Sequence, residues 1–135
     1  DLIALINKYK LNEQCSLLGE IDNINEIYES SHITVLSSSY GEAFPNVLAE
    51  SMLCFTPCVS TDVGDANLIL KDVGYIVPIR DYKSLANALL ENYYLLTNQK
   101  DLYLKNCLNA FKRVQSSYDI NNIADKYCNL WRSLI

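Results

Sequence analysis

Two glutamates beside one predicted helix are the residues best placed to do chemistry. Glu42 lies in a loop before the helix, and Glu50 lies inside it, eight residues later. At a rise of ~1.5 Å per residue, the two positions are up to ~12 Å apart along the helix axis. The two carboxylates of a glycoside-hydrolysing site are ~5 to 9.5 Å apart. We therefore do not expect Glu42 and Glu50 to act as one acid/base pair.

The spacing instead suits two hydrogen-bond acceptors that hold opposite ends of one elongated ligand rich in hydroxyl groups. Between them, the free backbone N–H groups from Phe44 to Val47 lie at the predicted helix N-terminus and could receive an anion. A nucleotide-diphospho-sugar has this layout, because its sugar and ribose offer hydroxyl donors and its diphosphate is the anion. The alternative is a favourable first-turn charge at Glu42 and an exposed helix residue at Glu50.

The elements that must position these residues alternate between helix and strand. Apolar residues three or four apart predict helices over Leu2 to Tyr9, Asn25 to Ser31, Val47 to Cys54 and Ala66 to Leu70. Short apolar runs predict strands at Cys15 to Gly19, Ile33 to Leu36, Pro57 to Ser60 and Tyr75 to Val77. Pro45 suits the first turn of its helix.

Short, nearly continuous apolar strands between helices indicate a sheet that is covered on both faces. The predicted fold class is therefore α/β, with a Rossmann-like doubly wound parallel sheet. Ligands of such sheets bind outside the carboxyl ends of the strands. The turns that should ring the site follow Leu18, Leu36, Ser60 and Val77.

The remainder of the chain is predicted to be helical. Helical spacing of apolar residues covers Tyr82 to Leu96, Leu102 to Val114 and about Ile120 to Leu134. We interpret residues 1–135 as a single partial domain, with an alternating helix/strand part over residues 1–80 and a helical part over residues 81–135.

Composition excludes several classes of partner. A formal net charge of −5 leaves no excess of cations to hold a nucleic-acid backbone or an anionic membrane surface. No run of ~18 apolar residues is present. The five cysteines are scattered without a CxxC pair, and His32 is the single histidine, so we expect mostly buried, reduced thiols and no metal site.

A longer motif contains the two glutamates. Its first part, Ser39-Tyr40-Gly41-Glu42-Ala43-Phe44-Pro45-Asn46-Val47-Leu48-Ala49-Glu50-Ser51-Met52, is followed by Thr56-Pro57-Cys58-Val59-Ser60-Thr61-Asp62-Val63-Gly64-Asp65. Together they resemble the C-terminal, donor-binding domain of family-4 retaining glycosyltransferases of GT-B architecture, glycosyl transferases group 1. Leu17-Leu18-Gly19 resembles the strand that ends near the nucleobase, and Gly74-Tyr75-Ile76-Val77-Pro78 resembles the glycine-led strand of the family.

The resemblance implies a role for each motif residue. Glu42 would be the catalytic-site acceptor for donor-sugar hydroxyls, and Glu50 would hold the ribose hydroxyls. Backbone amides around the donor-binding residues would approach the sugar and diphosphate, and these residues are Ala43, Phe44, Pro45, Asn46 and Val47. Gly19 and Tyr40 would border the same cleft. The donor would leave as a nucleoside diphosphate, with retained anomeric configuration and without a metal cofactor.

The implied function is transfer of a hexosyl group from a nucleotide sugar to a glycan or lipid-linked acceptor. Bacterial surface polysaccharide, such as lipopolysaccharide O-antigen, is the expected pathway. The alternatives are a sugar-nucleotide epimerase of the same architecture and a non-catalytic nucleotide-binding or regulatory α/β module. A receiver-like module would need acidic residues at its strand ends, where this chain has Gly19 and Ser37.

Two departures and one omission qualify the resemblance. Phe55 stands where the family usually has glycine and is expected to alter the turn before the next strand. Asp65 replaces a second common glycine and is expected to cap the following helix. The strands that bring an Arg and a Lys to the diphosphate are missing, so we expect an N-terminally truncated chain, without its acceptor-binding domain and inactive alone. The expected compartment is the cytoplasm, with any membrane contact made at the inner face through the missing sequence.

Overall fold

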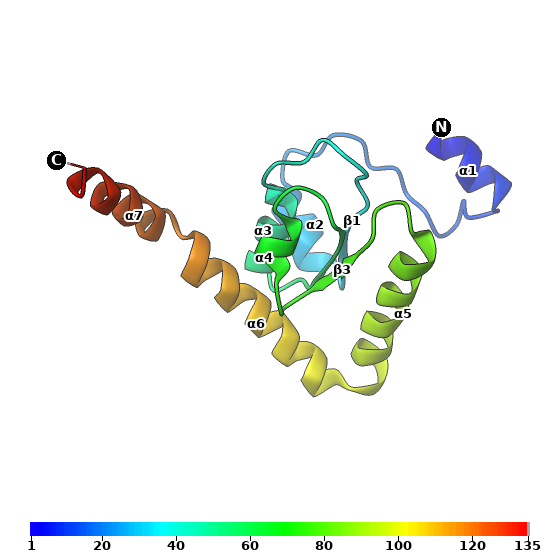
Figure 1. Cartoon of the computed structure of the whole chain (residues 1–135). Coiled ribbons are helices and arrows are strands. Elements are labelled where there is room, and N and C mark those ends of the chain that lie inside the picture. Colours follow the sequence, from blue (N-terminus) through cyan, green and yellow to red (C-terminus); the bar gives the residue numbers. More distant parts are fainter. Residues whose placement is uncertain (135) are drawn as a thin grey trace.

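A parallel sheet of three strands forms the centre of the chain (Figure 1). The computed structural model describes residues 1–134. The strands are β1 (Thr34–Leu36), β2 (Cys58–Thr61) and β3 (Tyr75–Val77), in the order β1-β2-β3. Leu36 pairs with Ser60, and Ser60 pairs with Ile76, so the carboxyl ends of all three strands meet at one edge. The predicted α/β class with a parallel sheet is confirmed.

Helices cover both faces of this sheet. Helices α3 (Asn46–Leu53) and α4 (Ala66–Leu70) follow β1 and β2 and pack on one face, whereas α5 (Tyr82–Asn98) packs on the other. Side chains of β2 alternate between the two layers. Cys58 belongs to the cluster that includes α3 and α4, and Val59 belongs to the cluster that includes α5. The near-complete burial of β2 follows from this double cover.

The long helix α6 (Lys100–Tyr118) closes the layer that contains α3. Ala110 and Val114 are buried in the same cluster as α3 and α4. Near its start, the Tyr103 hydroxyl donates a hydrogen bond of 2.7 Å to the carbonyl of His32, just before β1. The helices predicted over residues 82–96 and 102–114 are thus present, and each is longer than predicted.

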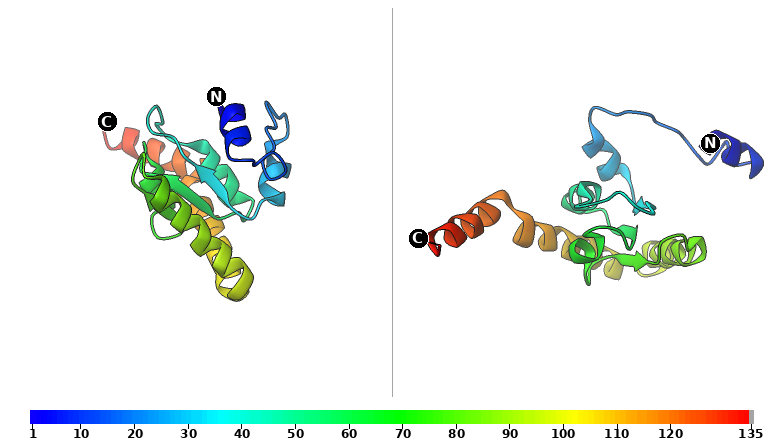
Figure 2. Two further views of the ribbon diagram at one scale, coloured as in Figure 1. Left: turned by 90° about the vertical axis from the view of Figure 1, so that its right-hand side faces the viewer. Right: turned by 45° about the horizontal axis from the view of Figure 1, so that its top comes forward.

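The first and last helices lie away from the sheet in Figure 1 and in the right-hand view of Figure 2. Neither α1 (Leu2–Lys8) nor α7 (Ile120–Arg132) has a buried residue, although each has apolar residues at helical spacing. By contrast, the short helix α2 (Ile24–Ser30) packs on α3 through the buried ring of Tyr28.

The prediction of a strand over Cys15 to Gly19 is wrong. Residues 15–19 form neither helix nor strand, and Leu17 and Leu18 are 54% and 58% exposed. An apolar run becomes a buried strand only where a neighbouring strand pairs with it and a second layer covers it. Within the described residues, no strand pairs with this segment.

Phe55 occupies a turn in a backbone conformation that glycine adopts readily. Its backbone has φ 60°, the left-handed conformation that glycine adopts readily, and it follows α3 directly. The ring stacks on Phe111 of α6, with a centroid separation of 4.3 Å and an interplanar angle of 8°. We attribute the stability of this strained conformation to the stacking contact, and whether Phe55 alters the turn relative to the family stays a prediction.

Asp65 and the cysteines also differ from the predictions. Asp65 does occupy the N-cap position of α4, but its side chain makes no capping hydrogen bond. Cys58 and Cys107 are buried, Cys54 is half-buried, and Cys15 and Cys128 are exposed, so most of the five thiols are not buried. All five are free.

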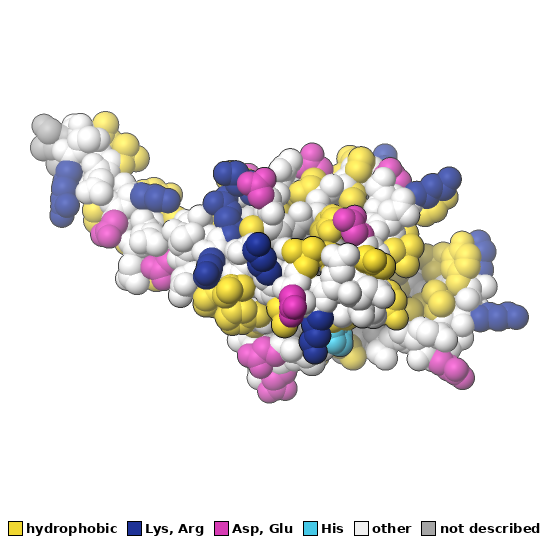
Figure 3. Space-filling model, turned by 90° about the horizontal axis from the view of Figure 1, so that it is seen from below, with side chains coloured by type: hydrophobic (Ala, Val, Ile, Leu, Met, Phe, Trp, Pro, Cys, Tyr) yellow, Lys and Arg dark blue, Asp and Glu magenta, His cyan; other side chains and the backbone are white. Residues whose placement is uncertain are grey.

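Cations and anions are mixed on the surface seen from below. Figure 3 shows lysine or arginine side chains next to aspartate or glutamate side chains, with apolar patches between them. None of the helices over residues 1–134 combines the length and the apolar character needed to span a bilayer.

Candidate functional site

The loop between β1 and α3 holds Glu42 at the carboxyl edge of the sheet. The Ser38 hydroxyl donates a hydrogen bond of 2.8 Å to Glu42 Oε1. The backbone carbonyl of Ser38 in turn accepts a bond from the hydroxyl of Thr61, the last residue of β2. Thr61 is buried, whereas Glu42 is half-buried. The chain of bonds therefore fixes one carboxylate oxygen and leaves the group partly open to solvent.

The turn after β2 holds the same loop through the backbone. The Asp65 amide donates a hydrogen bond of 2.7 Å to the carbonyl of Ala43. Gly64 has φ 49°, and a Cβ added there would lie 2.3 Å from the Ala43 carbonyl oxygen and 2.7 Å from that of Glu42. Only glycine permits this approach. The Gly64-Asp65 pair thus sets the backbone position of Glu42 and Ala43.

The N-terminus of α3 presents unpaired amides next to this loop. Pro45 is the N-cap residue, one position before the helix rather than in its first turn, and it offers no side-chain acceptor. Leu48 donates to the Pro45 carbonyl, but the amides of Asn46 and Val47 have no acceptor within residues 1–134. Together with the helix dipole, these N–H groups favour an anion at this end of α3.

Glu50 lies one turn into α3 and contacts a different element. The Tyr28 hydroxyl of α2 donates a hydrogen bond of 3.2 Å to Glu50 Oε2. Burial of the ring, followed by the charge and hydrogen bond of Glu50, raises the pKa of Tyr28 to about 12. Tyr28 therefore remains a donor at neutral pH. Glu50 is exposed, so its second oxygen is free to accept from a ligand.

Most of the predicted site residues lie on one loop and helix, and the strand predicted before Gly19 is missing. Glu42 to Val47 and Glu50 lie on one continuous loop and helix, and Tyr40 is 83% exposed on the same loop. Gly19, with φ 70°, is exposed in the segment that joins α1 and α2. Within residues 1–134 no strand precedes Gly19, so the predicted strand does not hold it at the sheet edge.

A cavity of about 180 Å³ opens at the carboxyl edge of the sheet. Its lining residues are Ser37, Thr61, Arg80, Asp81, Tyr82 and Leu85. Arg80 was not predicted as a site residue. The signal was available, since Arg80 closely follows β3 and strand ends of this kind ring the ligand. Its exposed guanidinium is a cation at the edge where Thr61 supports the Glu42 loop.

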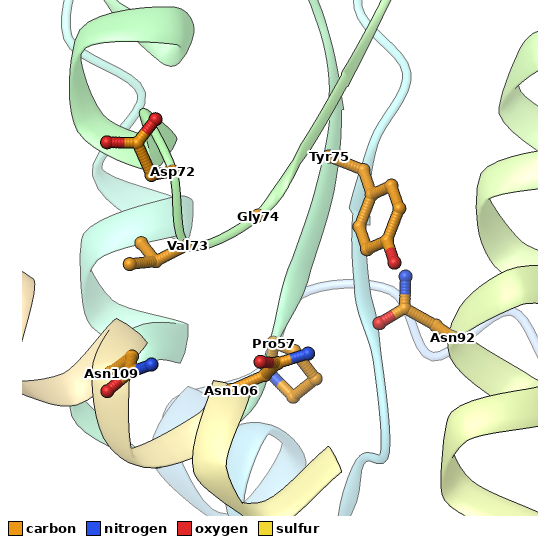
Figure 4. Close-up of a pocket in the computed structure, with 8 residues that line it drawn as sticks. All are labelled: Pro57, Asp72, Val73, Gly74, Tyr75, Asn92, Asn106 and Asn109. Carbon is orange, nitrogen blue, oxygen red and sulfur yellow. The ribbon is translucent and has the colours of Figure 1, made fainter. Parts of the chain in front are cut away.

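A second cavity, of about 130 Å³, lies at the opposite edge of the sheet (Figure 4). Pro57 and Gly74, just before β2 and β3, line it, and the amide groups of Asn92 and Asn106 point toward it. Asp72 is its one charged lining residue. A diphosphate would find no cation there and would meet a carboxylate, so this cavity does not suit such a ligand.

The parallel sheet, the acceptor pair and the unpaired amides define an α/β domain suited to an anionic ligand with hydroxyl groups. Residues 1–93 match the family described as glycosyl transferases group 1, and the chain belongs to this family. The match covers both glutamates.

Curated relatives are longer than this chain. Over 86 residues it is 36% identical to the amylovoran biosynthesis glycosyltransferase AmsD of Erwinia amylovora, covering 62% of this chain and 23% of that protein. It is 28% identical over 130 residues to the phosphatidyl-myo-inositol mannosyltransferase of Mycobacterium leprae, covering 92% of this chain and 33% of that protein. The chain thus spans a third or less of the length of these relatives.

Solved structures share the fold. Sucrose-phosphate synthase from Thermosynechococcus elongatus superposes with a TM-score of 0.83 at 28% identity, over 98% of this chain and 33% of that one. Anabaena Alr3699/HepE, solved in complex with UDP, gives a TM-score of 0.84 at 22% identity, over 98% of this chain and 36% of that one. The similarity to HepE concerns the fold alone.

Proposed function

We propose that this chain is the donor-binding part of a retaining glycosyltransferase that uses a nucleotide-diphospho-sugar. The arrangement of Glu42, the unpaired amides of Asn46 and Val47, and Glu50 along one loop and helix carries this proposal. The donor lies along α3. Glu42 accepts from sugar hydroxyls, the amides receive the diphosphate, and the free oxygen of Glu50 accepts from the ribose.

The reaction breaks the bond between the anomeric carbon and the diphosphate oxygen, and a bond to an acceptor hydroxyl oxygen forms with retention. The acceptor hydroxyl loses its proton to the departing diphosphate, so the step balances. Negative charge grows on the departing nucleoside diphosphate. The α3 amides and helix dipole stabilise that charge, because they are fixed before the reaction begins. The Ser38 bond keeps Glu42 from rotating away, so the sugar is held while the bond breaks.

We assign no acceptor-binding role to residues 1–134. We propose a glycan or lipid-linked acceptor in bacterial surface polysaccharide synthesis, such as that of O-antigen, at the cytoplasmic face of the membrane. The named role of AmsD in amylovoran biosynthesis supports a polysaccharide pathway. UDP and glucose in a HepE complex support a nucleotide sugar as donor.

A binding panel on the full-length protein tests the donor class. UDP-glucose, GDP-mannose and ADP-glucose are compared by thermal shift, and at 100 times its Kd a ligand stabilises the folded state by about 2.7 kcal/mol. At least one of these three nucleotide sugars should raise the Tm of the protein clearly, both with and without EDTA. No shift with any of the three would contradict the proposal.

Turnover then separates transfer from epimerisation. Nucleoside diphosphate should be released only when a glycan or lipid-linked acceptor is added, and the product should keep the anomeric configuration of the donor. Conversion of the donor sugar without acceptor would identify an epimerase instead. The 135 residues alone are expected to show no turnover.

A further inference from the structure

Phe44, in the centre of the candidate donor loop, contacts the end of a distant helix. Its ring meets the ring of Tyr118 edge-on, with centroids 5.3 Å apart and an interplanar angle of 68°. This is a favourable aromatic geometry. Tyr118 is the last residue of α6 and lies outside the motif that contains the two glutamates.

Tyr118 is itself held in place by two contacts. Its hydroxyl donates a hydrogen bond of 3.2 Å to the carbonyl of Leu68 in α4. The guanidinium of Arg113 lies 5.7 Å from its ring centroid and donates a bond of 2.8 Å to the same carbonyl. Arg113 Nη1 also donates to the Ser117 hydroxyl. Two α6 side chains thus converge on one backbone oxygen of α4.

The position of Arg113 is maintained although one of its donors has no partner. Its Nε is buried without a hydrogen-bond acceptor within residues 1–134. A buried unpaired donor is costly, so the other Arg113 contacts must outweigh that cost for the arrangement to persist. The Tyr118 ring is nevertheless held at the end of α6 by its hydroxyl bond to the Leu68 carbonyl and by the adjacent Arg113 guanidinium.

Besides the Thr61–Ser38 bond, the loop consequently has two attachments at residues 43 and 44. On one side, the Asp65 amide bonds the Ala43 carbonyl, next to Gly64. On the other side, the Phe44 ring rests against Tyr118. Both attachments lead to α4, because Asp65 is its N-cap and Leu68 lies within it.

We propose that Tyr118 is a positioning residue that holds Phe44 and, through it, aligns the amides at the start of α3 with the donor. The alignment with a donor rests on the proposed function. Tyr118 does not touch the ligand. It acts on the backbone of residues 43–47, where small displacements of fixed N–H donors reduce their interaction with a developing charge.

Residue-resolved hydrogen exchange on the full-length protein tests the positioning without any ligand. The reporter amides are Asp65 and Leu48, which bond the loop carbonyls of Ala43 and Pro45. Tyr118→Ala should raise their exchange rates about 3- to 10-fold, as expected from loss of one aromatic pair. Tyr118→Phe keeps the ring contact and should raise them less than about 2-fold.

Phe111→Ala is the matched control. Phe111 is also an aromatic residue of α6, but it stacks on Phe55 at the other end of α3. We therefore compare the exchange rate of the Asp65 amide with that of the buried Val59 amide. Phe111→Ala should leave the ratio of these two exchange rates unchanged. Equal effects of Tyr118→Ala and Phe111→Ala on that ratio would overturn the proposal, as would failure of Tyr118→Phe to restore slow exchange.

A ligand readout on the same variants separates this proposal from the proposed function. If wild type binds UDP-glucose, Tyr118→Ala should weaken UDP-glucose and UDP by about 3- to 10-fold and change uridine binding less than about 2-fold. If wild type binds none of the nucleotide sugars, the proposed function fails, and hydrogen exchange still decides whether Tyr118 holds the loop.

Discussion

Replacement of Phe55 separates backbone strain from aromatic packing. The left-handed backbone at φ 60° costs a residue with a side chain roughly 1 to 2 kcal/mol, and glycine avoids this cost. In return, the Phe55 ring stacks on Phe111. Alanine at position 55 would keep the strain and lose the ring, whereas glycine would lose both.

The magnitudes follow from these contacts. Phe55 is 48% exposed, so roughly half of its surface is covered, and about 100 Å² at 25 cal/mol per Å² gives an upper estimate of about 2.5 kcal/mol. We expect Phe55→Ala to lower the free energy of unfolding by about 2 kcal/mol. Phe55→Gly should be about 1 kcal/mol more stable than Phe55→Ala.

Position 111 provides the matched contrast. It lies in the interior of α6, where glycine is less stable than alanine by about 1 kcal/mol. Urea unfolding should therefore show that Phe55→Gly is more stable than Phe55→Ala, and that Phe111→Ala is more stable than Phe111→Gly. A Phe55→Ala/Phe111→Ala double-mutant cycle should give a coupling of about 1 kcal/mol. Alanine more stable than glycine at position 55 would refute the reasoning.

The remaining predictions concern the close approach at Gly64 and the Tyr28–Glu50 hydrogen bond. Gly64→Ala should lower the free energy of unfolding by about 3 kcal/mol, because backbone strain and a clash with two carbonyls add. Gly41→Ala, with φ 85° and open space around the added Cβ, should lower it by only about 1 to 2 kcal/mol. Equal losses of the two variants in urea unfolding would exclude the clash. The pKa of Tyr28 is raised from 10.0 to about 12 in the folded protein. The contribution of the neutral Tyr28 hydroxyl to folding stability is therefore complete below pH 10 and is lost as the pH rises to 12. The stability difference between wild type and Tyr28→Phe, measured by urea unfolding under reducing conditions, should fall by at most about 2.7 kcal/mol over this window, and no fall would contradict the assignment.

Periodicity predicted the fold well where tertiary packing agrees with local pattern. Strands β2 and β3 and the helices α3 and α5 were expected because their apolar residues lie at the spacing that two covering layers require. The same reasoning failed at Cys15 to Gly19. A local apolar run does not reveal whether a partner strand is adjacent, and the pairing in this chain begins at β1.

Spacing singled out Glu42 and Glu50 as candidate site residues but did not identify their supports. Glu42 and Glu50 could be singled out because the motif is local in sequence. Their partners Ser38 and Tyr28 could not be assigned, since each contact depends on how the loop or α2 packs. For the same reason, the sequence could not identify Tyr118 as a support of the loop. Tyr118 contacts Phe44 although the two residues are 74 positions apart in the chain.

The structure also shows how the two residues expected to depart from the family pattern are held in place. Phe55 keeps the glycine-like backbone because a second aromatic residue, distant in sequence, covers its ring. Asp65 uses its backbone amide rather than its side chain to hold Ala43, so the loop is attached by a bond that does not depend on the side chain at position 65. Both compensations are tertiary.

Titration calorimetry on the full-length protein tests the central claim most directly, with a nucleotide sugar and the matching bare nucleoside diphosphate as ligands. Glu42→Gln should weaken the sugar nucleotide by about tenfold or more and affect the diphosphate less, because Glu42 contacts the sugar. Glu50→Gln should weaken both ligands by a similar factor, because the ribose is common to them. Equal losses for both ligands in both variants would contradict the account.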